Sequence, residues 1–238
     1  MRILSKPTSL ATALILAFCT TSCARFLPWG NAPLRPEVNL AFTLERNLVE
    51  LQTVRINDRP GRFLLGSAAP RTVLDPKFMS AGRQTIQMSE KETVDIKPSA
   101  LDLGGVADGI IGADVWGNRA ISIDYKAGLV TYQKLGIERS LMTVYEYEVE
   151  PMIYVNVDGK DVAAIVDTTS PDTLVLPSPN NGRGTARIRV ATTEFGLVDV
   201  RYANVTHARV GNRVLSRFLV TIDYGKKEVG LFRDTRTS

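Results

Sequence analysis

The sequence predicts an all-β protein built as two similar lobes by an internal duplication. Short runs rich in Val, Ile, Thr and Tyr recur about every 8–15 residues after residue 38, separated by Gly, Pro, Asn or Asp, as in β-strands. Two long stretches of the chain repeat each other at a constant spacing, which indicates a tandem architecture. No segment has a helical pattern long enough to join two parallel strands, so a parallel α/β sheet is not expected.

The expected strands lie in every part of the chain after residue 38. The clearest are residues 49–56, 120–124, 152–157 and 218–223. Only residues 113–119 and 76–82 have a composition compatible with a helical turn.

The repeat relates residues 54–72 to residues 155–173 at an offset of 101 without a gap. Two later features repeat at an offset of 99: Gly112 with Gly211, and the Ile-Asp-Tyr triplet at 123–125 with that at 222–224. Each half therefore has strand, polar turn, strand, a short acid-or-small motif, a hydrophobic-hydrophobic-Gly step and a closing strand. We expect lobes at residues 48–136 and 137–238, with Gly66 and Asp167 facing each other near a pseudo-two-fold axis.

The N-terminus has the pattern of a bacterial export signal. Arg2 and Lys6 precede an apolar run at residues 10–18, which is shorter than the roughly 20 residues of a membrane-spanning helix. We expect residues 1–22 to be a signal peptide and the mature protein to be in the bacterial cell envelope, facing the periplasm.

Small residues precede Cys23, as at the cleavage site of bacterial lipoproteins, although Thr20 stands where such signals usually have Leu. Lipidation of Cys23 would anchor the chain in a membrane, with residues 23–47 as the lipidated N-terminus and a Pro-containing tether. Ordinary signal-peptidase cleavage after Ala24 is the alternative.

Composition excludes several classes of function. Of 238 residues, 44% are hydrophobic and 23% charged, which is typical of a globular protein rather than a disordered one. The formal charge is only +4 and no basic cluster is evident, so no nucleic-acid partner is expected. One His and two Cys cannot form an ordinary zinc site, and we expect no metal and no cofactor.

Residues 166–173, Val-Asp-Thr-Thr-Ser-Pro-Asp-Thr, resemble the Asp-Thr-Gly-Ser active-site loop of the pepsin and retropepsin-like aspartic proteases. Residues 108–114 resemble the hydrophobic-hydrophobic-Gly signature of the same superfamily, and residues 122–125 its closing strand. The resemblance covers about residues 44–235. It implies a two-lobed acid-protease barrel fold and a catalytic site made from one loop of each lobe.

The catalysis of that family needs two carboxylates that share a proton, one as general base and one as general acid. In the second half the motif positions hold Asp167, Thr168, Thr169 in place of Gly, and Ser170. In the first half they hold Gly66, Ser67 and Ala68, so the first catalytic Asp is absent. The resemblance implies that the hydroxyls of Ser67 and Thr168 bond across to the opposite loop. Loss of one acid/base partner costs about 10²–10⁴ in rate, so ordinary dyad catalysis within one chain is not expected.

No other residue replaces the missing acid in the sequence pattern. We interpret Asp75 as a solvated turn residue, His207 as a strand-surface residue and Trp116 as core. A Ser-His nucleophile would need His207 beside Ser67 or Ser170, which we do not favour. The remaining aspartates occupy matching turn or edge positions in the two halves: Asp58, Asp158, Asp124 and Asp223.

Three hypotheses of function follow. The leading one is a non-catalytic homologue of aspartic proteases that binds a peptide or an envelope protein. The alternative is an active aspartic endopeptidase that completes its dyad by dimerisation or by an unrecognised second acid. The third is a structural envelope component without a specific ligand.

Overall fold

The computed structural model describes residues 39–80, 82–90 and 92–233 of the chain, all within the unit Pro36–Ser238. The predicted signal peptide and Cys23 lie outside the described residues. Of the described residues, 52% are in strands and 4% in helices, which confirms the all-β class. Among the described residues there is no helical segment that could span a lipid bilayer.

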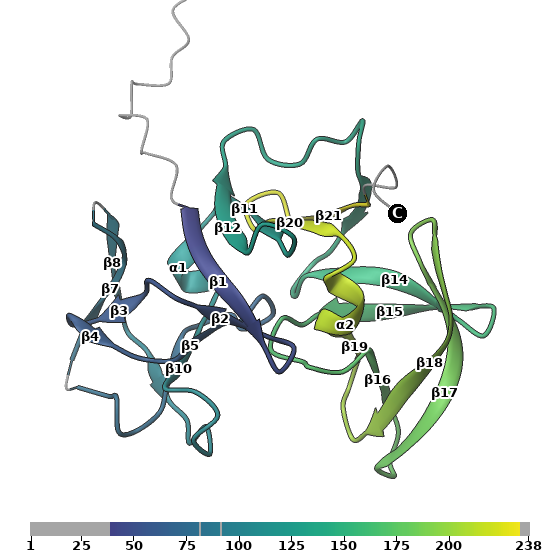
Figure 1. Ribbon diagram of the computed structural model, residues 1–238, viewed down its shortest axis with the longest axis horizontal. Coiled ribbons are helices and arrows are strands. Elements are labelled where there is room, and N and C mark those ends of the chain that lie inside the picture. The colour runs from purple at the N-terminus through teal and green to yellow at the C-terminus, as the bar shows by residue number, and fades with distance from the viewer. Residues whose placement is uncertain (1–38, 81, 91, 234–238) are drawn as a thin grey trace, which may run out of the picture. The chain divides into compact units, whose positions relative to one another are not determined.

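The largest element is an eleven-stranded sheet to which both halves of the chain contribute (Figure 1). Its order is β13-β21-β20-β11-β12-β1-β2-β5-β10-β6-β9. The strands are β1 (Asn39–Glu45), β2 (Leu48–Leu51), β5 (Phe63–Leu65), β6 (Val73–Leu74), β9 (Ser99–Ala100), β10 (Gly109–Ile111), β11 (Ala120–Asp124), β12 (Leu129–Gln133), β13 (Thr143–Glu146), β20 (Leu219–Asp223) and β21 (Glu228–Phe232).

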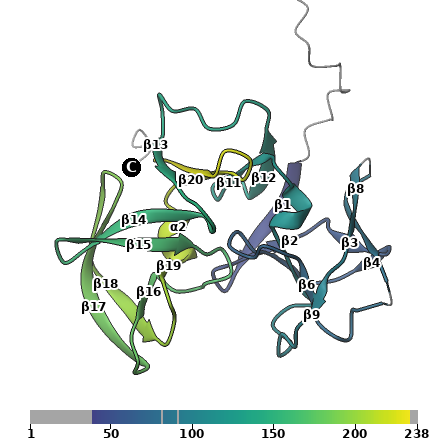
Figure 2. The same cartoon turned by 180° about the vertical axis from the view of Figure 1, so that it is seen from behind.

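A closed barrel contains most of the second half, in the order β14-β15-β19-β16-β18-β17. Its strands are β14 (Met152–Val157), β15 (Lys160–Val166), β16 (Leu174–Pro177), β17 (Gly182–Val190), β18 (Thr193–Ala203) and β19 (Ala208–Val210). The long hairpin of β17 and β18 is visible from both sides (Figures 1 and 2). A four-stranded sheet in the first half has the order β4-β3-β7-β8, from β3 (Arg55–Ile56), β4 (Arg59–Pro60), β7 (Gln84–Ser89) and β8 (Glu92–Ile96).

The same strand pairings occur around the two motif loops. In the first half β5 pairs parallel with β10, and β10 pairs antiparallel with β6. In the second half β15 pairs parallel with β19, and β19 pairs antiparallel with β16. Each motif loop therefore begins at the end of a strand, β5 or β15, that pairs with a parallel neighbour.

The halves are joined where β11 and β20 pair antiparallel in the large sheet. Ser122 lies directly opposite Thr221, and their hydroxyl oxygens are 2.6 Å apart in a buried hydrogen bond. These two residues are equivalent at the offset of 99, so the register pairs each closing strand with its counterpart.

Each half has one four-residue helix directly after its repeated Gly. These are α1 (Ala113–Trp116) after Gly112 and α2 (Asn212–Leu215) after Gly211. The helical turn expected at 113–119 is thus present, whereas residues 76–78 form a turn and not a helix. The sequence analysis did not anticipate α2. The expected strand at 49–56 is interrupted, because residues 52–54 are not extended between β2 and β3.

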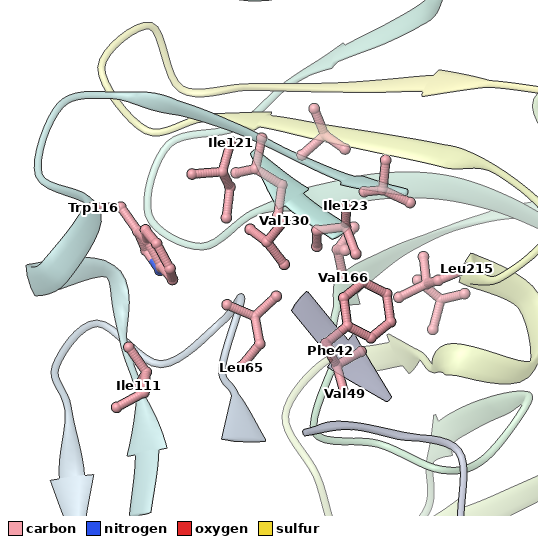
Figure 3. Packing of buried hydrophobic residues seen from close by; sticks show 14 of the residues in the cluster. Phe42, Val49, Leu65, Ile111, Trp116, Ile121, Ile123, Val130, Val166 and Leu215 are labelled. Carbon is pink, nitrogen blue, oxygen red and sulfur yellow. The ribbon is translucent and has the colours of Figure 1, made fainter. Parts of the chain in front are cut away.

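The hydrophobic core is continuous through the large sheet and around the two loops (Figure 3). Phe42, Leu65, Trp116, Val166 and Leu215 all belong to it. Because residues of both halves fill one core, the loops that follow Leu65 and Val166 are held by apolar packing on the strand side.

Candidate functional site

The candidate site is the place where the loop after β5 meets the loop after β15. Four hydrogen bonds join them, all involving buried hydroxyl groups. The Ser67 backbone N–H donates to Thr168 Oγ1, and the Thr168 N–H donates to Ser67 Oγ, each at 3.0 Å. The Ser67 hydroxyl donates to the Val166 carbonyl, and the Thr168 hydroxyl donates to the Leu65 carbonyl. We call these four bonds the cross-loop clasp.

The clasp is reciprocal and fully buried. Ser67 is 1% exposed and Thr168 is 0% exposed, so water does not compete for these groups. Each hydroxyl donates once and accepts once, which matches the capacity of a Ser or Thr side chain. The hydrogen-bonding expected of Ser67 and Thr168 is therefore present.

Two tyrosines and an asparagine support the clasp from behind. The Tyr224 hydroxyl donates to the Ser67 carbonyl at 3.1 Å. Asn212 Nδ2 donates to the Thr168 carbonyl at 2.7 Å, and Asn212 Oδ1 accepts from the Tyr125 hydroxyl at 2.7 Å. Burial raises the pKa of both tyrosine hydroxyls, because the low-polarity surroundings disfavour the charged phenolate.

The carboxylate of Asp167 is already occupied by other groups of the chain. Its Oδ1 accepts from the Thr169 backbone N–H at 2.9 Å and from the Thr169 hydroxyl at 2.6 Å. Its Oδ2 accepts from Arg209 Nη1 at 2.8 Å, forming an ion pair in which the Asp167 side chain is 7% exposed and the Arg209 side chain 36%. Both oxygens thus have strong donors, and the charge is compensated.

Arg209 is the residue that the sequence analysis missed. It lies on β19 beside Ile165 of β15, in the position that Ile110 of β10 occupies beside Leu64 of β5. The signal was available, because the step before the glycine reads Ile-Ile-Gly at 110–112 and Arg-Val-Gly at 209–211. The second half therefore departs from the hydrophobic-hydrophobic-Gly pattern at its first position.

On the other side, the space next to Gly66 is filled by apolar atoms. A Cβ at residue 66 would lie less than 3.0 Å from Ile110 Cγ2 and from Ala69 Cβ. Contacts this short require the neighbours to move. Gly66 also donates its N–H to the Ile111 carbonyl at 2.9 Å, which fixes the loop against β10. A carboxylate has no room here in the present packing.

The remaining motif residues line the same loops. Ala68 and Thr169 are partly exposed, and Thr169 uses its hydroxyl on Asp167 instead of leaving a glycine there. Ser170 is 6% exposed, and its hydroxyl has no hydrogen-bond partner among the described residues.

Asp75 corrects one expectation. It is 4% exposed rather than solvated. Its Oδ1 accepts from the Lys77 N–H at 3.1 Å and its Oδ2 from the Leu103 N–H at 3.2 Å. These two bonds, that of Lys77 first, lower the pKa of the carboxyl. The side chain joins its own turn to the segment at residue 103 and does not reach the motif loops through these bonds.

The other candidate acids have the turn roles expected of them. Asp58 and Asp158 have φ of 61° and 49°, the left-handed conformation that Asp tolerates in tight turns. Asp124 and Asp223 each accept backbone N–H groups two and three residues ahead.

Two further residues complete the search for chemistry near the loops. His207 is exposed and precedes β19, so it lies in a bend rather than in a strand. Trp116 is 1% exposed and packs edge-on against Tyr132, as expected for a core residue. Within the described part of the chain no group of three or more His, Cys, Asp or Glu is arranged to hold a metal ion.

Comparison of the chain with protein-family models gave no match, and comparison with curated proteins gave none either.

Proposed function

We propose that the protein is an exported homologue of the pepsin and retropepsin-like aspartic proteases that binds a peptide or an envelope protein without hydrolysing it. The observation that carries the proposal is the state of the Asp167 carboxylate. Of the two equivalent positions 66 and 167, only residue 167 is a carboxylate, and it is held by Arg209 and Thr169. A dyad needs a second carboxylate and a free oxygen to activate water, and this site offers neither.

Retention of the clasp supports descent from a two-loop acid-protease site. The bonds run from each hydroxyl to the opposite loop, across residues separated by 101 positions. The repeated strand pairings and the Ser122–Thr221 contact support the proposed duplication and its pseudo-two-fold axis. A scaffold that keeps its two loops together while losing its proton chemistry is suited to binding. The export signal and the lipidation of Cys23 that we expect from the sequence support a location of the proposed binder at a membrane of the envelope.

The alternative of a dyad shared between two chains meets a physical obstacle. To pair Asp167 with Asp167 of a second molecule, the second loop would have to move away from the first. This movement would break the four buried hydrogen bonds of the clasp. Each buried group left unsatisfied costs about 1–3 kcal/mol.

Pepstatin binding tests the proposal. Pepstatin is an inhibitor whose central hydroxyl binds between the two carboxylates of an aspartic protease. We therefore expect that pepstatin does not raise the melting temperature of the wild-type chain. Sedimentation with and without pepstatin is the companion measurement. A pepstatin-stabilised dimer would contradict the proposal and favour the shared dyad.

A further inference from the structure

A cavity of about 390 Å³ lies beside the loop that follows Asp167, and arginines dominate its charged lining. We call it the arginine pocket. Its charged residues are Arg46, Arg183, Arg201, Arg213, Asp172 and Asp199.

The charges of the arginine pocket do not cancel. Arg201 Nε donates to Asp172 Oδ2 at 2.6 Å, which pairs one cation with one anion. Arg213 Nε donates to the Pro171 carbonyl at 3.3 Å, and Arg213 has no ion pair among the described residues. Within the described part of the chain, Arg183 forms no ion pair. Arg46 lies 3.9 Å from Glu45, which does not line the pocket. The lining itself carries four positive and two negative side chains.

Two of these arginines face each other across the β17–β18 pair, and among the described residues only Arg201 of the two has an acidic partner, Asp172. Arg183 of β17 lies directly opposite Arg201 of β18 in the strand register. Like charges in directly opposed positions of an antiparallel pair repel each other and destabilise it. A ligand with negative charge would remove this repulsion on binding.

The fold also leaves backbone groups uncovered on the strand that carries Arg183. Among the described residues, β17 pairs with β14 only over residues 188–190, so no strand covers its outer edge over residues 182–186. Arg183 belongs to this uncovered stretch. An extended peptide can add to such an edge through main-chain hydrogen bonds.

We infer that the arginine pocket binds the carboxylate groups of an acidic peptide segment. The guanidinium groups match carboxylates by paired N–H donors, and the uncovered edge of β17 favours a peptide over a free ion. Asp172 and Asp199 limit the net charge of the lining, which suits one or two carboxylates better than a densely charged phosphate. This inference rests on the proposed function, because it names the chemistry of the peptide that the protein binds.

The test uses the purified full chain and a fluorescein-labelled hexaglutamate peptide, with binding followed by fluorescence anisotropy at low salt. Labelled hexaglutamine is the uncharged comparison. We expect the chain to bind hexaglutamate and not hexaglutamine, with an affinity that falls as salt rises.

The variants are Arg183→Gln with Arg213→Gln in one chain, and Arg187→Gln as the matched control. Arg187 is an exposed arginine on the same strand that does not line the pocket. We expect the double variant to lose about tenfold or more in affinity and the control to lose less than about twofold. We also expect Arg183→Gln alone to raise the melting temperature slightly, because it removes the opposed pair. A structural role for Arg183 would lower it.

Four results would overturn the inference. Two of them are no hexaglutamate binding by the wild-type chain and an equal loss of affinity in the Arg187→Gln control. The other two are displacement of the peptide by inorganic phosphate at concentrations where chloride of the same ionic strength does not displace it, and binding to vesicles of anionic lipid that the double variant loses and the control keeps. The outcome is separable from the proposed function. Peptide hydrolysis by the chain would refute the proposed function. If the chain neither hydrolyses peptides nor binds hexaglutamate, only the inferred binding of acidic peptides is refuted.

Discussion

The loop at Gly66 and the loop at Asp167 share a backbone framework and differ in what fills their centres. Both follow a short strand with a parallel neighbour, and each contributes one hydroxyl to the cross-loop clasp. At the equivalent place beside them, Ile110 fills the space next to Gly66, whereas Arg209 neutralises Asp167. The site therefore keeps its backbone framework without its acid–base chemistry. Apolar packing fills the first loop, and an ion pair neutralises the second.

The largest effect should come from the framework that the two loops share. Thr168→Ala leaves the Ser67 N–H and the Leu65 carbonyl without their partner, and we expect a loss of about 2–4 kcal/mol in the free energy of unfolding. Urea denaturation measures it. Thr168→Ser keeps the hydroxyl and should lose far less, and an equal loss in both variants would mean that the methyl group, not the clasp, matters.

The next effect should come from the charged centre. Arg209→Ile gives the second loop the residue type of Ile110 but leaves a buried carboxylate without its ion-pair partner. Because two Thr169 donors remain, we expect a loss of about 1–3 kcal/mol. Adding Asp167→Asn should recover part of this loss in a double-mutant cycle. Arg187→Ile, at an exposed site, is the control, and additivity of the Asp167 and Arg209 changes would contradict the pairing.

A smaller effect should come from the apolar centre. Gly66→Ala introduces a Cβ against Ile110, so we expect a loss of about 1–2 kcal/mol from overpacking. Ile110→Ala in the same chain should relieve the contact, so that the combined loss is less than the sum of the two single losses. Gly182→Ala, where a Cβ meets open space, is the matched control. Equal losses at residues 66 and 182 would show that Ile110 does not close this centre.

The smallest effect concerns the tyrosines behind the clasp. Burial raises the pKa of Tyr125 and Tyr224 in the folded chain. Below about pH 10, the pKa of tyrosine in the unfolded chain, both tyrosines are neutral in both states, and their full contribution to the free energy of unfolding is present. As pH rises above that value the unfolded chain loses these protons first, and stability declines. We expect Tyr224→Phe to reduce the decline by about 1 kcal/mol at pH 11. Tyr154→Phe is the matched substitution at an exposed site, and the same change in stability at pH 11 for both variants would contradict burial as the cause.

The resemblance to the aspartic-protease motif implied the hydroxyl bonds of the clasp, and the repeat showed that Ser67 and Thr168 occupy the equivalent positions. The sequence analysis did not predict Arg209, since strand periodicity treats a position as inward or outward and does not say what an inward arginine contacts. The repeat also aligns Ile110 with Arg209. Comparing these two residues would have shown that an arginine replaces an apolar residue next to the second loop.

Two other errors have similar causes. Asp75 is buried because N–H groups from residues 77 and 103 converge on it, and the second of these is distant in the chain. The four residues of α2 are too few to show helical periodicity, and only their correspondence with α1 would have indicated them.

The most direct test of the central claim is peptide hydrolysis by the wild-type chain beside Asp167→Asn, between about pH 3 and pH 7. A mixture of unfolded protein substrates avoids any assumption about sequence preference. The account predicts that the two chains are equally inactive and that pepstatin changes neither, because one carboxylate held by Arg209 cannot serve as base and acid together. Pepstatin-sensitive cleavage by the wild-type chain that Asp167→Asn abolishes would contradict it, and would mean that a second carboxylate reaches the site.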